Sequence, residues 1–169
     1  MIHPTAIIHP GAKLHDSVRV GPYSIIDEHV TVGAGCELGP YVHLTGHTTI
    51  GAENRFHTGC VIGDAPQDLK HTGEPTRLIV GDRNLFREHV TVHRSNMPDE
   101  DTRIGSENFF MANSHVGHNT VVGNKVVLAN GALVGGHAMI DDGAFLSGNA
   151  VVHQFCRVGA FAMMQGCAG

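Results

Sequence analysis

Apolar residues recur at every sixth position through nearly the whole chain. Counting by six from Ile2 to Met164, 25 of 28 positions hold apolar side chains. A second column, four residues after each of these anchors, holds small or medium side chains such as Cys36 and Ala132. Neither the helical period of 3.6 nor the strand period of 2 explains a period of six. Three hexads that each form one flat side give a triangular coil, and such coils stack about 4.8 Å apart as parallel strands. The sequence therefore predicts an all-β solenoid of roughly nine coils.

The period breaks only at Asp68, Glu74 and Pro98. Segments 64–77 and 94–103 are polar and contain proline, so we expect loop insertions there within a single domain, residues 1–169. Protruding loops favour ligand contacts, and tolerated insertions without a function are the alternative. Glycine often follows an anchor, as in Val20-Gly21, and we expect these glycines to supply the unusual dihedrals of the corners.

Composition and charge narrow the class of protein. The chain has 169 residues, 22 glycines and only 5% aromatic residues. We find neither a run of about 18 apolar residues nor a signal peptide, which predicts a cytoplasmic protein. A formal charge of −5 argues against indiscriminate nucleic-acid binding. The four cysteines form no CxxC pair, and Cys36, Cys60 and Cys156 occupy the small-residue column, so we interpret them as interior packing residues rather than disulfide partners or metal ligands.

Residues that are 18 apart should stack on one corner of the prism. His118, Gly136 and Gln154 have this spacing, and His137 and His153 adjoin them. A neutral imidazole accepts a proton from a hydroxyl at pH 7, and a glycine N–H is open to an oxyanion. These groups favour acyl transfer. The sequence has no G-x-S-x-G, Walker A or HExxH motif, so a serine hydrolase, a kinase and a zincin are unsupported.

Seven segments resemble the acyl-carrier-protein:UDP-N-acetylglucosamine O-acyltransferases, the family that begins lipid A biosynthesis. The resemblance extends over essentially the whole chain, and the segments that carry it are Ile2–Ala6, Gln67–Lys70, Gly73–Arg77, Thr91–Arg94, Asn113–His118, Gly136–His137 and His153–Cys156. The resemblance implies a left-handed parallel β-helix, a homotrimer with clefts between subunits, and direct transfer without a metal or an organic cofactor. The implied substrates are UDP-N-acetylglucosamine and an acyl carrier protein bearing an (R)-3-hydroxyacyl chain.

The resemblance also assigns roles. It implies that His118 is the general base that deprotonates the glucosamine 3-hydroxyl, and that the N–H of Gly136 receives the oxyanion. Gly166 matches a position that limits acyl-chain length, where glycine leaves room for a longer chain. The other implied substrate contacts are His115, His137, His153 and Gln154, together with a loop from a neighbouring subunit that carries Gln67, Asp68 and Lys70.

Two departures from the family pattern leave alternatives open. The base is commonly followed by Asp, whereas Asn119 follows it here and would orient His118 without adding a negative charge. The chain ends at Gly169 inside the repeat, so we expect a fragment or shortened relative that lacks the C-terminal helical domain. A truncated or engineered scaffold without activity is one alternative. A zinc-dependent trimeric carbonic anhydrase is another, although His115 and His118 are three residues apart rather than five. The acyl-chain length and a 3-amino acceptor also stay open.

Overall fold

Most strands of this protein are only two residues long, and the second residue is the apolar anchor of its hexad. In the computed structural model, which describes residues 1–169, the anchors Val20 and Ile26 are buried while the preceding Arg19 and Ile25 are exposed. Because side chains alternate between the two faces of a strand, a two-residue strand points one side chain into the prism and one outward.

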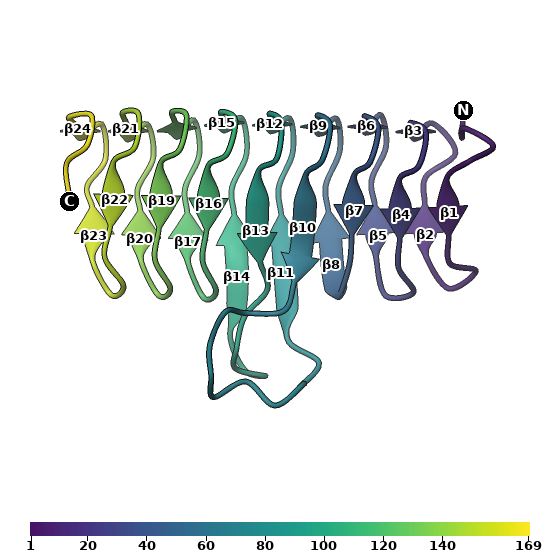
Figure 1. The fold of residues 1–169 in the computed structure, drawn as a ribbon, viewed down its shortest axis with the longest axis horizontal. Helices are drawn as coiled ribbons and strands as arrows, with labels where there is room; N and C mark the ends of the chain where they lie inside the picture. The colour runs from purple at the N-terminus through teal and green to yellow at the C-terminus, as the bar shows by residue number, and fades with distance from the viewer.

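The 24 strands form three parallel sheets of eight, which are the three faces of a long triangular prism (Figure 1). The first sheet consists of β1 (Ile7–Ile8), β4 (Ile25–Ile26), β7 (His43–Leu44), β10 (Val61–Asp64), β13 (Thr91–His93), β16 (His115–Val116), β19 (Leu133–Val134) and β22 (Val151–Val152). The second sheet consists of β2 (Lys13–Leu14), β5 (Thr31–Val32), β8 (His47–Ile50), β11 (Arg77–Val80), β14 (Asp101–Ile104), β17 (Val121–Val122), β20 (Met139–Ile140) and β23 (Arg157–Val158). The third sheet consists of β3 (Arg19–Val20), β6 (Glu37–Leu38), β9 (Arg55–Phe56), β12 (Leu85–Phe86), β15 (Phe109–Phe110), β18 (Val127–Leu128), β21 (Phe145–Leu146) and β24 (Met163–Met164).

Two loops leave the middle of this prism on the same side (Figure 1). The first loop, residues 65–76, joins β10 to β11, and the second loop, residues 94–100, joins β13 to β14. Where a regular coil takes 18 residues, Arg77 lies 30 positions after its strand partner His47, and Asp101 lies 24 positions after Arg77. Both excesses are multiples of six, so the count by six resumes in phase after each loop.

A single apolar cluster of 33 buried residues fills the prism along its length. Cys36 and Cys60 are fully buried within it, as the small-residue column predicts. The prediction is wrong for Cys156, which is exposed in this structure. No element is an apolar helix long enough to cross a membrane.

The glycines after the anchors have a different role from the one expected. Gly21 is not in the left-handed region. A Cβ there would lie 2.7 Å from the carbonyl carbon of Gly39 in the next coil, so close stacking of the backbone requires glycine. The left-handed corner residue is instead the third after the anchor, for example Tyr23, Asn119 or His137, with φ between 56° and 58°. Asparagine tolerates this conformation better than most residues.

Candidate active site

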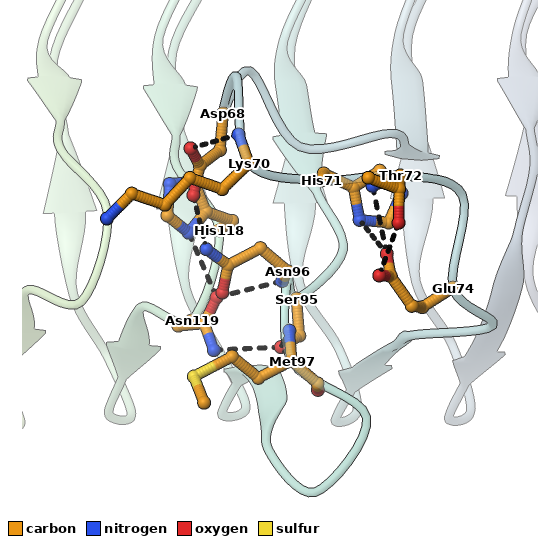
Figure 2. Close-up of polar contacts among 10 residues, drawn as sticks. All are labelled: Asp68, Lys70, His71, Thr72, Glu74, Ser95, Asn96, Met97, His118 and Asn119. Atoms are coloured by element: carbon orange, nitrogen blue, oxygen red, sulfur yellow. Dashed lines mark hydrogen bonds and ion pairs between the residues drawn. The ribbon is translucent and has the colours of Figure 1, made fainter.

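The corner between the first and second sheets holds the predicted base, His118. Its Nδ1 lies 2.9 Å from Oδ1 of Asn119. Three further bonds fix the amide orientation of Asn119. Oδ1 accepts from the Asn96 N–H at 3.0 Å, and Nδ2 donates to Ser95 Oγ at 2.8 Å (Figure 2). Nδ2 also donates to Glu100 Oε2 at 2.8 Å. Because a carbonyl oxygen only accepts, the His118 proton resides on Nδ1. This leaves Nε2 of His118 as a free proton acceptor.

Gly136 lies against the imidazole of His118, as the 18-residue register through Val116 and Val134 requires. A Cβ on Gly136 would approach Nε2 and Cε1 of His118 to 2.7 Å, so only glycine fits there without displacing the ring. The Gly136 N–H is absent from the coil-to-coil hydrogen bonds formed by its neighbours Gly135 and His137. An acceptor of protons and an unbonded N–H donor thus lie side by side.

His137 forms one wall of this site. Its ring meets His118 edge to face at 5.2 Å and stacks on Phe155 at 4.7 Å. Burial, followed by the charge of His118, lowers the pKa of His137 below its ordinary value. This shift favours the neutral form of the His137 ring.

His115 and His93 lie behind His118 on the first sheet. Nδ1 of His115 is 2.7 Å from Thr91 Oγ1, and its ring meets His93 edge to face at 4.8 Å. Burial is the largest cause that lowers the pKa of His115 to about 4, and the charges of His93 and His118 act in the same direction. Burial likewise lowers the pKa of His93. Imidazoles this close to each other do not all carry a proton, which favours a neutral cluster.

The first loop brings Asp68 to the same corner (Figure 2). Its Oδ1 accepts from the Lys70 N–H at 3.0 Å, and its Oδ2 accepts from Nδ2 of Asn96. The Lys70 N–H, then Asn96 and then the charge of His118 hold the pKa of Asp68 below its usual range. Within one chain, Asp68 therefore lies beside His118 of that same chain, while Gln67 and the Lys70 side chain are exposed.

The remaining predicted residues either lie farther from this corner or make few contacts with other residues of the same chain. Gln154 and His153 are exposed on the coil above Gly136, and Nδ1 of His153 is 3.2 Å from the Gln154 carbonyl oxygen. Gly166 is on a different corner, where it stacks over Gly148, so a single chain does not join it to His118.

Sequence reasoning missed five residues of this site: His93, Ser95, Asn96, Glu100 and Phe155. Three of them belong to the second loop, where the six-residue period gives no register. Phe155 follows Gln154 directly, so its spacing of 18 from His137 was a usable signal.

The six-residue repeat and the three-sided prism place the chain in the hexapeptide-repeat class of proteins. The family model described as bacterial transferase hexapeptide (six repeats) matches residues 29–64 and 101–136.

Comparison with known proteins narrows this class. The acyl-[acyl-carrier-protein]–UDP-N-acetylglucosamine O-acyltransferase of Janthinobacterium sp. is 49% identical over 96% of this chain and 63% of its own length. The UDP-N-acetylglucosamine O-acyltransferase structure from Moraxella catarrhalis superposes with a TM-score of 0.93 at 41% identity, over 98% of this chain and 65% of that chain. A further UDP-N-acetylglucosamine acyltransferase structure has a TM-score of 0.82 at 31% identity, over 95% of this chain and 67% of that chain.

The chain belongs to the family of acyl-[acyl-carrier-protein]–UDP-N-acetylglucosamine O-acyltransferases. The superposition also confirms the left-handed parallel β-helix. The chain spans 51% to 63% of the length of the curated relatives it matches first.

Proposed function

We propose that this chain transfers an (R)-3-hydroxyacyl group from acyl carrier protein to the 3-hydroxyl of UDP-N-acetylglucosamine, the first step of lipid A biosynthesis. One observation carries the proposal. His118 has its proton fixed on Nδ1 by Asn119, and its free Nε2 lies against Gly136, whose N–H has no partner. Family membership supports this choice of substrates.

The chemistry follows from these two groups. Nε2 of His118 takes the proton of the sugar hydroxyl, and the oxygen attacks the thioester carbonyl carbon. The Gly136 N–H stabilises the resulting oxyanion. When the carbon–sulfur bond breaks, the imidazolium returns its proton to the thiolate of the carrier. The products are the 3-O-acyl sugar nucleotide and the free carrier thiol, so no metal or organic cofactor is required.

A homotrimer is part of the same proposal. His153 and Gln154 are exposed, and Gly166 lies on another corner, so a substrate that contacts all three needs a surface from a neighbouring chain. We also propose that Gln67, Asp68, Lys70, His115 and His137 contact the substrates and that Gly166 admits a long acyl chain. The cytoplasmic location stays a prediction.

The test is transfer of a labelled 3-hydroxyacyl group from carrier protein to UDP-N-acetylglucosamine. We expect His118→Ala to lower kcat by about 10²- to 10⁴-fold, the typical contribution of a general base. His15→Ala is the control, because His15 is exposed and bonds only with Ser17. Unchanged transfer by His118→Ala would remove this mechanism, and a folded wild-type chain without transfer would indicate a scaffold. The 3-amino analogue of the sugar nucleotide, run in parallel, distinguishes the two acceptors.

A further inference from the structure

The second loop carries a carboxylate that reaches the base through a single amide group. Nδ1 of His118 bonds to Oδ1 of Asn119, and Nδ2 of Asn119 donates to Oε2 of Glu100 at 2.8 Å. The three groups form one continuous series from imidazole to amide to carboxylate. Asn119 is buried, while about half of the Glu100 side chain is exposed.

This arrangement has an electrostatic consequence. Asn119 alone orients His118 but brings no charge to the imidazolium that forms when the base takes a proton. A carboxylate on Nδ2 polarises the amide, so its Oδ1 becomes a stronger acceptor for the Nδ1–H of His118. A negative charge beyond the amide also attracts the imidazolium directly.

We propose that Glu100 is a positioning residue that stabilises the protonated form of His118 during acyl transfer by acting through the amide of Asn119. This inference rests on the proposed function. Orientation of the amide does not depend on Glu100, because the Asn96 N–H and Ser95 Oγ hold its two ends independently. Replacing Glu100 by Gln therefore removes the charge while leaving the geometry of the base in place.

Other charged groups face the same imidazole and need to be separated from this effect. Asp68, from the first loop, interacts with His118 through its charge, and Oε2 of Glu100 is also 3.9 Å from Nδ1 of His137. An action of Glu100 through His137 does not pass through residue 119. A double-mutant cycle between residues 100 and 119 therefore isolates the proposed connection.

The kinetic test compares four intact proteins: wild type, Glu100→Gln, Asn119→Asp and the double variant. We expect Glu100→Gln to lower kcat about three- to eightfold, because the partly exposed charge is screened, with KM for the sugar nucleotide within about twofold. Asn119→Asp places two carboxylates in contact. In that background Glu100→Gln should raise kcat, since Gln donates to Asp and the new charge sits directly on His118.

The change of sign between the two backgrounds is the decisive result. A loss of similar size in both backgrounds, or no loss in either, would overturn the proposal. Asp99→Asn is the matched control, because Asp99 is the exposed acidic neighbour of Glu100 in the same loop. Its kcat should equal that of the wild type.

A measurement without substrates separates this inference from the proposed function. In protein with ¹⁵N-labelled histidine, the Nδ1–H proton resonance of His118 should move upfield in Glu100→Gln, because its hydrogen bond to Asn119 weakens. Asp99→Asn should leave the resonance unchanged. If the resonance does not move in Glu100→Gln, the proposed action of Glu100 on His118 through Asn119 is wrong, whether or not the protein transfers acyl groups. A wild type that fails to transfer, with the resonance shift present, contradicts only the proposed function.

Discussion

At the residue scale, the contact between Gly136 and the base makes a sharp prediction. In Gly136→Ala the new Cβ would sit 2.7 Å from the His118 ring, so the ring must move away from its position. Misplacing a general base by about 1 Å costs on the order of 10²-fold in rate, and we expect a fall of that size in kcat. Gly148→Ala is the control, because the nearest atom to its Cβ is 3.6 Å away. Equal activity in both variants would contradict the packing of His118 on Gly136.

The half-buried His115 makes stability depend on pH. Its pKa is about 4 in the folded chain, below the ordinary value of 6.5. Between these values the unfolded chain binds a proton that the folded chain excludes. The contribution of His115 to the free energy of unfolding is therefore fully present above pH 6.5. It is lost as the pH falls toward 4, and the loss is roughly 3 kcal/mol.

Urea unfolding at fixed protein concentration, between pH 7.5 and pH 4.5, measures this effect. We expect His115→Asn to lose much less free energy of unfolding over this interval than the wild type. Parallel pH dependence in the two proteins would show that His115 is already solvated in the folded state.

At the scale of elements, three inward phenylalanines tie β9, β12 and β15 together. The rings of Phe56 and Phe86 stack at 4.7 Å, and those of Phe86 and Phe110 lie 5.0 Å apart. These strands span the two coils from which the loops depart, so the stack supports the prism where the chain leaves it.

We expect Phe86→Ala to lower the free energy of unfolding by about 3 to 5 kcal/mol, because Phe86 is fully buried and its removal leaves a cavity. Met163→Ala, on the outer face of the same sheet and 73% exposed, should change it by less than about 0.5 kcal/mol. Denaturant unfolding followed by circular dichroism measures both. If Phe86→Ala lowered the free energy of unfolding as little as Met163→Ala is expected to, the core would tolerate the cavity.

At the scale of the whole molecule, a groove between subunits can form only where one outer face of the prism packs against a second chain. His115 points outward from the first sheet beside His118, and Leu133 and Val151 continue the same outward row above it, each more than 40% exposed. This face joins an apolar strip to the candidate base. It is the surface on which we expect a second chain to pack.

Light scattering should give a mass three times the 18.0 kDa of one chain. We expect Leu133→Glu to reduce this mass, because a buried unpaired charge destabilises an interface. Val121→Glu, equally exposed on the second sheet, should leave the mass unchanged. A monomeric wild type would contradict the trimer, and dissociation by Val121→Glu alone would move the interface to the second sheet.

The sequence by itself determined the prism and part of its site. A strict period of six specifies which side chains point inward, and a coil of 18 residues specifies that His118 and Gly136 share a corner. These features depend only on repetition, so they can be counted along the chain. The role of Gly21 could not be predicted by counting positions, because it depends on how closely two backbones approach.

Only the tertiary structure decided what surrounds the base. Asp68, Asn96 and Glu100 lie in loops without a period. Nothing in their spacing indicates that Asn96 and Glu100 bond to Asn119, or that Asp68 bonds to Asn96. His93 and His115 are 22 positions apart in the sequence, yet their rings are in contact because an inserted loop shifts the coil between them. Contacts that depend on the path of a loop, and on the burial it produces, are decided in three dimensions.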